Sequence, residues 1–405
     1  MGLRDDLATV IAGEVVNDTA TLDHYSTDAS IFRLKPRLVV FPTNTSDIEN
    51  LVQYVSHHPS HPPLSLTPRS GGTDMTGGPL TSSIVVDVNR HLRGIEQLTT
   101  RSVTVKVGTP FSELEQALTQ RGLLYPAYPA SKAQATVGGM VANNSGGEKT
   151  LRFGKTERYV QSVSAVLADG REHTFQRLTA GHAAQKSHEP GFEGQLYQTL
   201  VPLLRDHATA IAKARPGVTK NSTGYALWNA YDPKTGAVNL GQLLIGSQGT
   251  LGIITEVTLG VVAAEPATAL LVVYLSDTRD LGRVSELLAR HEPTSVELYD
   301  DKSLKVALSF APQLIGALTK DRSLLELIAE SIPDLKIMLF HGVPKLVLMA
   351  EFTGTYARDV QHRAETAELE LNQQNIPVIR TRNRDQAEKY WTIRRQSFKD
   401  RKSVV

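Results

Sequence analysis

The sequence predicts an α+β protein with two domains, and two observations lead to this fold class. The chain has 405 residues, of which 40% are hydrophobic and 21% charged, a composition typical of a globular protein with more than one core. Alternating strand and helix patterns begin at Arg37, and a second series begins after Pro266. An Ala-rich break precedes Pro266, so we place the domain boundary there.

The elements of the first series follow from local patterns. Residues 3–12 read as a short helix, and the apolar, β-branched run 37–41 reads as a strand between two prolines. Residues 46–49 form a capping box before a helix with one apolar face. Further helices are expected at 112–121, ended by Gly122, and around 196–204. Further strands are expected at 64–67, 84–88, 103–107, 160–168, 242–246 and 253–260.

The second series has the alternation of a smaller sheet covered by helices. A mixed stretch separates its first strand and helix from the rest. We expect strands at 269–275, 345–352 and 376–381, and helices at 280–290, 357–373 and from about 385.

Charge and apolar patterning exclude several classes of protein. The 43 basic and 42 acidic side chains nearly cancel, which gives no reason to expect a nucleic-acid partner. No apolar run approaches the ~18 residues of a membrane helix, and Asp5 and Asp6 do not suit a signal peptide. We therefore expect a cytoplasmic protein. Residues 376–405 hold nine Lys or Arg and three acids, so peripheral contact with the inner face of the membrane stays open, although an ordinary exposed segment is the favoured interpretation.

Three glycine-rich groups each lie beside a predicted strand. They are residues 68–78 (PRSGGTDMTGG), 135–147 (ATVGGMVANNSGG) and 246–256 (GSQGTLGIITE). Glycine lets backbone N–H groups approach an anion closely, and consecutive N–H groups form an anion-binding nest. A diphosphate suits such a loop. None of the groups matches the Rossmann or P-loop spacing, so a nucleotide site here is of another kind.

These groups, together with residues 24–30 (HYSTDAS) and 220–225 (KNSTGY), resemble the FAD-linked oxidoreductases of the vanillyl-alcohol oxidase type. The nearest branch is that of D-lactate dehydrogenase and the glycolate oxidase catalytic subunit. The resemblance covers residues 20–400 in order. It implies a two-part PCMH-type FAD-binding domain at 36–264 after a helical lead-in at 1–35. A ferredoxin-like α/β cap domain, incomplete at its C-terminus, would follow at 265–405.

The resemblance also assigns roles to the glycine-rich groups. Residues 70–74 would hold the FAD diphosphate, and the flavin-lining segment, residues 135–147, would line the flavin and its ribityl chain. Residues 246–254 would add further contacts. The cofactor-binding residues implied in this way are Arg69, Ser70, Gly71, Gly72, Thr73, Asp74, Pro129, Thr136, Gly138, Gly139, Asn143, Ser145, Gly146, Gly249, Gly252, Ile253 and Ile254.

The attachment of FAD can be inferred from two positions. Relatives with histidyl-FAD have a histidine directly after the glycines of the first loop, where this chain has Thr73. The chain contains no cysteine, which excludes a cysteinyl link, thiol nucleophiles and Cys-ligated iron–sulfur clusters within it. We expect noncovalent FAD.

Oxidation of a 2-hydroxy acid needs a hydride acceptor, a base and a cation for the carboxylate. The resemblance points to Arg394 as the carboxylate ligand, a role that suits the bidentate fork of arginine. The family carries its base, often with a divalent metal, in a His-x-Gly-Asp-Gly-Asn-x-His segment, which this sequence lacks. We identify no metal site, and the histidines of residues 57–63 belong to a proline-rich loop.

The sequence leaves three functions open. The first is FAD-dependent oxidation of a small D-2-hydroxy acid, such as D-lactate, glycolate or D-2-hydroxyglutarate, with electrons passing to a quinone or protein acceptor. The second is a truncated FAD-binding fragment, or a subunit that a partner polypeptide completes. The third is a flavin oxidase of an alcohol or sugar. Arg394 favours the first, and the missing histidine segment favours the second.

Overall fold

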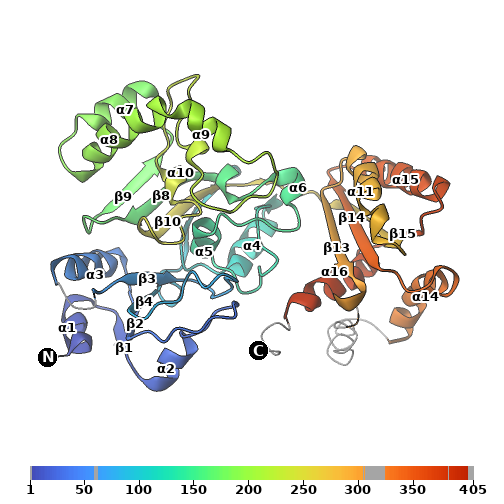
Figure 1. The fold of residues 1–405 in the computed structure, drawn as a ribbon, viewed down its shortest axis with the longest axis horizontal. Helices are drawn as coiled ribbons and strands as arrows, with labels where there is room; N and C mark the ends of the chain where they lie inside the picture. The colour runs from blue at the N-terminus through green and yellow to red at the C-terminus, as the bar shows by residue number, and fades with distance from the viewer. Residues whose placement is uncertain (1, 59–62, 304, 306–323, 382, 400–405) are drawn as a thin grey trace. The chain divides into compact units, whose positions relative to one another are not determined.

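The computed structural model describes residues 2–58, 63–303, 305, 324–381 and 383–399. Residues 59–62 of the proline-rich loop therefore lie outside the described part. The chain divides into two compact units (Figure 1). The first unit comprises Met1–Gly147 and Gly154–Ala263, and the second comprises Glu148–Phe153 and Ala264–Val405.

The first sheet of the first unit has the strand order β1-β2-β4-β3. Strands β2 (Leu38–Phe41) and β3 (Leu66–Arg69) run parallel to β4 (Ile84–Asp87), whereas β1 (Glu14–Val16) pairs antiparallel with β2. Every residue of β2 and β4 is buried, which explains their continuous apolar sequences. Helices α1 (Leu3–Val10), α2 (Thr19–His24) and α3 (Thr45–His57) belong to the same half.

Helix α3 begins earlier than its sequence pattern suggested. Asn44 is its N-cap, and the Asn44 side chain accepts a 2.9 Å hydrogen bond from the Asp47 N–H. The proposed capping box at residues 46–49 is therefore wrong. The Asp47 carboxylate instead accepts the N–H groups of Ala12 and Thr43, so a tertiary contact uses the acid of the first turn.

The second sheet of the first unit is antiparallel, with the order β5-β6-β10-β8-β9. Its strands are β5 (Ile95–Leu98), β6 (Ser102–Lys106), β10 (Ile253–Gly260), β8 (Val160–Val166) and β9 (Glu172–Gln176). The strand expected at 242–246 is wrong, because Gly241–Leu244 form helix α10. A short apolar run does not distinguish a buried strand from a buried helical turn. The other elements are α4 (Phe111–Thr119), β7 (Leu123–Leu124), α5 (Val137–Ala142), α7 (Ala180–Ser187), α8 (Phe192–Asp206), α9 (Ala208–Ala214) and β11 (Val262–Ala263).

The second unit is built on an antiparallel sheet with the order β13-β14-β12-β15. The chain order is β12 (Ala267–Leu275), α11 (Leu281–Arg290), β13 (Ser295–Asp300), β14 (Leu346–Gly354), α15 (Ala357–Gln373) and β15 (Val378–Arg380). This βαββαβ order with β12 between β14 and β15 is ferredoxin-like, as predicted. Helices α11 and α15 pack on one face. Helix α16 (Arg384–Lys399) packs on the other, and α14 (Leu324–His341) and α6 (Thr150–Phe153) complete the unit.

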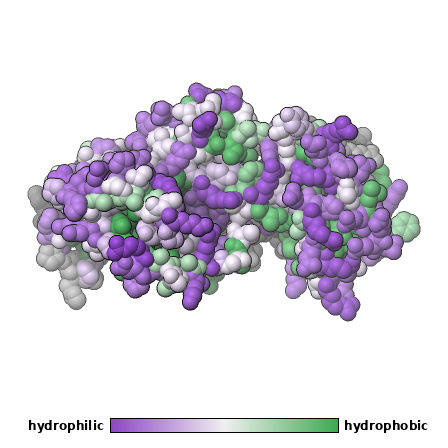
Figure 2. Space-filling view, turned by 90° about the horizontal axis from the view of Figure 1, so that it is seen from above, coloured by the Kyte–Doolittle hydropathy of each residue, from purple (hydrophilic) through white to green (hydrophobic). Residues whose placement is uncertain are grey.

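The surface is largely polar. The face in Figure 2 is mostly hydrophilic, and its apolar residues lie in small separate patches. Among the described helices, none has both the length and the apolar character required to cross a bilayer.

Candidate functional site

The first glycine-rich loop begins where β3 ends, at Arg69. Within the described part of the chain, the backbone N–H groups of residues 71–74 form no hydrogen bonds. Gly72 lies at φ +62°, a left-handed conformation that suits glycine. The loop therefore presents successive unpaired N–H donors at the carboxyl end of a parallel strand, which is the geometry of an anion nest.

The three glycine-rich groups lie against one another, and glycines stand at the contacts. A Cβ at Gly71 would come within 2.1 Å of the Gln134 carbonyl oxygen, and a Cβ at Gly139 would come within 2.8 Å of Ser70 Cβ. In the third group, a Cβ at Gly249 would lie 2.4 Å from Pro68 Cγ. At Gly71 the close neighbour is backbone, and at Gly139 and Gly249 it is a side chain that starts or lies close to the main chain. One surface thus forms from three distant parts of the chain.

Hydrogen bonds fix the three groups together. Ser70 Oγ lies 2.5 Å from Thr136 Oγ1, and Thr136 donates to Asn89 Oδ1 at 3.2 Å. The third group is bound to helix α5 because the Gln248 N–H donates to the Ala142 carbonyl at 2.9 Å. These bonds hold the first loop at the start of the flavin-lining segment and the third loop at the end of helix α5.

Arg69 is a buried cation directly beneath the first loop. Its guanidinium donates to the Thr27 carbonyl at 2.7 Å and lies over the Tyr25 ring, whose hydroxyl donates to Asp87 at 2.7 Å. Burial lowers the pKa of Arg69, and the nearby charge of Asp28 opposes that shift. In the described part of the chain, Arg69 Nη1 and Asp28 Oδ2 are buried without a hydrogen-bond partner.

A diphosphate fits this arrangement. The unpaired N–H groups of residues 71–74 and the unused Nη1 donor of Arg69 are complementary to phosphate oxygens. The Asp74 carboxylate accepts the Gly78 N–H at 2.7 Å and the Thr76 hydroxyl at 2.8 Å, so it bonds within its own loop. Asp74 thus organises the loop.

A turn at residues 155–157 supports the end of the flavin-lining segment. The Ser145 carbonyl accepts both the N–H and the hydroxyl of Thr156 at 2.9 Å. Asn143 Nδ2 donates to Ser145 Oγ at 2.9 Å. Lys155 is 5% exposed, and its Nζ lies 3.8 Å from Glu157 Oε2. Burial lowers the pKa of Lys155, so this side chain gives the segment a cation of weakened basicity.

The other predicted cofactor residues have mainly packing contacts. The Gly138 N–H donates to the Val107 carbonyl at 2.8 Å, and Gly252 packs on the Val166 carbonyl. Ile253 and Ile254 are buried at the start of β10. The remaining predicted positions lie in loops at the same surface: Thr73 accepts from Ser131 Oγ at 3.4 Å, Pro129 packs near Gly147, and Gly146 follows helix α5.

Arg394, the predicted carboxylate ligand, belongs to helix α16 of the second unit. Its Nη2 donates to Glu297 Oε2 of β13 at 2.7 Å, and both side chains are less than a fifth exposed. The structure therefore holds the Arg394 guanidinium against an internal carboxylate. Glu297 was not anticipated, because β13 lies in the mixed stretch of the sequence.

A buried polar cluster fixes α16 to the sheet. Asp334 of α14 accepts the hydroxyl groups of Tyr274 and Tyr390, the latter at 2.9 Å, and pairs with Lys389 Nζ at 2.8 Å. Burial raises the pKa of both tyrosines. The cluster holds the helical turn before Arg394.

Sequence reasoning also missed Asn89 and Pro68 on the surface that the three glycine-rich groups form. Pro68 lies inside the first glycine-rich group, which was the available signal. Asn89 gave none, because it reaches Thr136 only through the fold. Among the described residues, no group of three or more His, Cys, Asp or Glu side chains is arranged to hold a metal ion.

Comparison with known families agrees with both units. The FAD binding domain model matches residues 36–176, and the model for the C-terminal domain of FAD linked oxidases matches residues 265–405. The chain belongs to the FAD-linked oxidoreductase family that carries these two domains. Its predicted PCMH-type fold and its family are thereby confirmed.

Individual relatives share part of their length with this chain. A D-2-hydroxyglutarate dehydrogenase of Pseudomonas putida is 31% identical over 298 residues, which are 73% of this chain and 29% of the relative. The glycolate oxidase subunit GlcD of Bacillus subtilis is 26% identical over 74% of this chain and 53% of its own length. The chain thus spans about three tenths of the first relative.

Solved structures share the fold at low identity. Alkyldihydroxyacetonephosphate synthase matches with a TM-score of 0.64 at 16% identity, and the match covers 95% of this chain and 62% of the synthase chain. p-Cresol methylhydroxylase with substrate bound has a TM-score of 0.62 at 12% identity and covers 95% of this chain and 68% of its own.

Proposed function

We propose that the chain binds FAD noncovalently and oxidises a small D-2-hydroxy acid. The observation that supports this most is the convergence of the three glycine-rich groups on one surface with unpaired N–H donors. The family match and the names of the relatives, which include D-2-hydroxyglutarate dehydrogenase and D-lactate dehydrogenase, support the reaction class.

In this proposal the first loop and Arg69 hold the diphosphate, and the flavin-lining segment holds the flavin. When bound, FAD supplies a hydride acceptor. The protein positions the acid, and Arg394 binds its carboxylate through a bidentate fork. Because Glu297 already pairs with Arg394, the substrate carboxylate has to compete with an internal one. This competition raises the concentration of acid that is needed to occupy the site. In the absence of the acid, the ion pair with Glu297 keeps the guanidinium oriented.

The electron acceptor in this proposal is a quinone or a protein carrier. Support comes from one relative, which is named D-lactate dehydrogenase [cytochrome] in Kluyveromyces lactis and is 28% identical over 67% of this chain and 38% of its own length.

Anaerobic reduction tests the proposal. The purified chain with FAD is mixed with D-2-hydroxyglutarate, D-lactate or glycolate, and the flavin absorption band is followed. Bleaching by at least one acid, and none by the L-enantiomers of the chiral acids, is the expected result. Arg394→Gln should raise KM for that acid at least tenfold, whereas Arg358→Gln, at an exposed position of α15, should leave it unchanged. A stable FAD complex that none of the acids reduces would refute the proposed reaction.

A further inference from the structure

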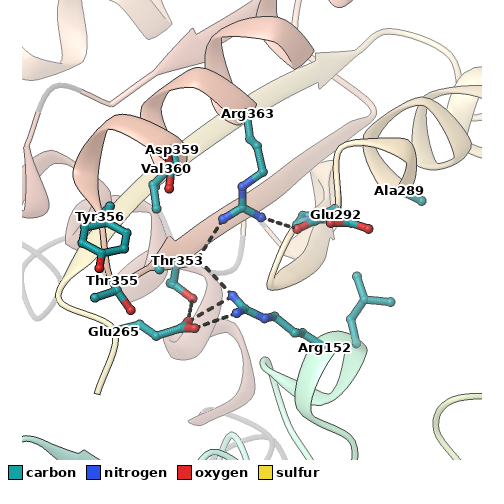
Figure 3. Close-up of a pocket in the computed structure, with 13 residues that line it drawn as sticks. Arg152, Glu265, Ala289, Glu292, Thr353, Thr355, Tyr356, Asp359, Val360 and Arg363 are labelled. Atoms are coloured by element: carbon teal, nitrogen blue, oxygen red, sulfur yellow. Dashed lines mark hydrogen bonds and ion pairs between the residues drawn. The ribbon is translucent and has the colours of Figure 1, made fainter. Parts of the chain in front are cut away.

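A cavity of about 680 Å³ with both polar and apolar lining residues lies within the second unit (Figure 3). Two arginines line it, Arg152 from α6 and Arg363 from α15, and both extend toward Thr353 at the end of β14. The cluster formed by Arg152, Glu265 and Thr353 is called the Arg152 clamp below.

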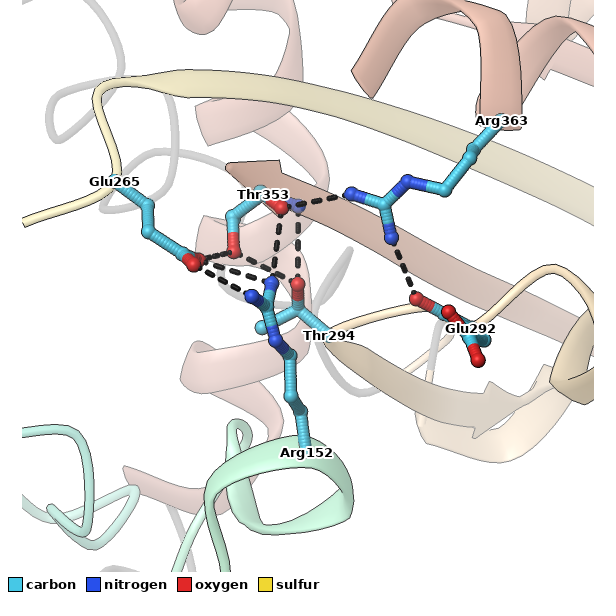
Figure 4. Close-up of polar contacts among 6 residues, drawn as sticks. All are labelled: Arg152, Glu265, Glu292, Thr294, Thr353 and Arg363. Carbon is cyan, nitrogen blue, oxygen red and sulfur yellow. Dashed lines mark hydrogen bonds and ion pairs between the residues drawn. The ribbon is translucent and has the colours of Figure 1, made fainter. Parts of the chain in front are cut away.

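The Arg152 clamp is densely bonded (Figure 4). Arg152 forms a fork with the Glu265 carboxylate at 2.7 and 3.1 Å, and its Nη1 also donates to the Thr353 carbonyl at 3.0 Å. Glu265 accepts the Thr353 hydroxyl as well, and Thr353 Oγ1 lies 2.7 Å from Thr294 Oγ1. The Glu265 side chain is only 14% exposed, so its charge depends on Arg152 for compensation.

Arg363 contacts the same carbonyl from another helix. Its Nη2 donates to the Thr353 carbonyl at 2.9 Å, and its Nη1 donates to the Glu292 carbonyl at 2.9 Å. Arg363 thus binds the same strand end, but it belongs to the continuous part of the second unit, residues 264–405.

Arg152 differs because its segment interrupts the first unit. Residues 148–153 belong to the second unit, whereas the chain before and after them belongs to the first. Gly147, at one end, packs on the Tyr128 carbonyl, where a Cβ would lie at 2.3 Å. Gly154, at the other end, has φ +75°. The excursion is therefore short, is bounded by glycines, and directly follows the flavin-lining segment.

We propose that the Arg152 clamp positions the flavin-lining segment, so that Arg152 is a positioning residue for bound FAD. This inference rests on the proposed function. A six-residue excursion that is anchored through Arg152 limits the freedom of both its ends, including residues 143–147. Without the fork, one of the restraints on this backbone is lost, and the added entropic cost of ordering it weakens FAD binding. Through Glu265, the clamp also holds the start of the segment 264–405 of the second unit.

The test compares Arg152→Gln with Arg363→Gln in the full chain. The FAD dissociation constant and the visible circular dichroism of the bound flavin are measured, and thermal unfolding checks each fold. Arg152→Gln should weaken FAD binding about tenfold and change the dichroism band. Arg152→Lys, which restores the charge without the fork, should recover part of both. Arg363→Gln should bind FAD within about twofold of wild type, although it loses two hydrogen bonds at the same strand end.

The outcomes separate the inference from the proposed function. Wild-type FAD affinity and dichroism in Arg152→Gln would overturn the positioning role alone, and so would an equal loss in Arg363→Gln. A wild-type chain that binds no FAD would overturn the proposed function and the positioning role together. If Arg152→Gln does not fold, Arg152→Lys carries the comparison, with a severalfold loss expected and full wild-type behaviour overturning the role.

Discussion

Gly71→Ala tests the contact between the first two glycine-rich groups, on which the proposed FAD site depends. The new Cβ would lie 2.1 Å from the Gln134 carbonyl oxygen and 3.2 Å from its carbonyl carbon. Both atoms are backbone, so no side-chain rotation relieves the clash. The first loop and the start of the flavin-lining segment have to separate by about 1 Å to restore a normal contact of roughly 3.2 Å or more.

The size of the effect follows from the bonds that this separation breaks. Ser70 and Thr136 bridge the two segments through a 2.5 Å contact, and the N–H groups of residues 71–74 would no longer aim at one anion. Charge-assisted hydrogen bonds contribute about 1.5–3 kcal/mol each. Losing one of them, at about 1.4 kcal/mol per decade, predicts FAD binding about 10- to 150-fold weaker. Overpacking itself costs about 1–3 kcal/mol of stability.

The assay is FAD titration followed by quenching of flavin fluorescence, with thermal unfolding measured on the same samples. Gly181→Ala is the matched control, because its Cβ has nothing within 4 Å in helix α7, and alanine suits a helix better than glycine. The control should keep wild-type FAD affinity and a stability equal to or above wild type. A folded Gly71→Ala protein with unchanged FAD affinity would refute the convergence of the loops on the diphosphate.

Further perturbations test the supporting contacts. Thr136→Val removes the hydroxyl that contacts Ser70 and donates to Asn89, and at about 1 kcal/mol per bond it should weaken FAD binding roughly 5- to 30-fold by titration; an unchanged affinity would contradict its bridging role. Glu297→Gln removes the competing carboxylate, so steady-state kinetics should give a lower KM for the hydroxy acid with FAD affinity unchanged, and a raised KM would mean that Glu297 serves mainly to orient Arg394. Burial raises the pKa of Tyr274 and Tyr390 in the folded chain, so their stabilising contribution is complete below their unfolded pKa of about 10 and is lost as the pH rises above it. The melting temperature should therefore fall steeply above about pH 10, and less steeply in Tyr274→Phe. Equal slopes of melting temperature against pH in the two proteins would argue against a buried Tyr274 phenol.

The fold was predictable where burial leaves a clear pattern. Strands β2 and β4 are buried on both faces and read as continuous apolar runs. Strand β13 was missed because polar residues such as Ser295 and Glu297 occupy it, and helix α10 was mistaken for a strand because four residues do not establish a period.

The site was predictable only in its local part. The glycines marked the loops because close backbone contacts leave a compositional signal. Their partners Asn89 and Gln134 left no such signal. The Gln134 contact is made by its backbone carbonyl, which every residue type has. Arg152 is likewise one arginine in a polar stretch, and its pairing with Glu265 arises from tertiary structure across 113 positions.

The central claim is that this chain holds FAD noncovalently on the surface formed by its three glycine-rich groups. The most direct measurement is the ratio of flavin to protein in the chain after reconstitution with FAD and gel filtration, followed by heat denaturation. We predict one FAD per chain, recovered entirely as free FAD in the supernatant. A chain without flavin would contradict the site, and flavin that remains on the denatured polypeptide would contradict noncovalent binding.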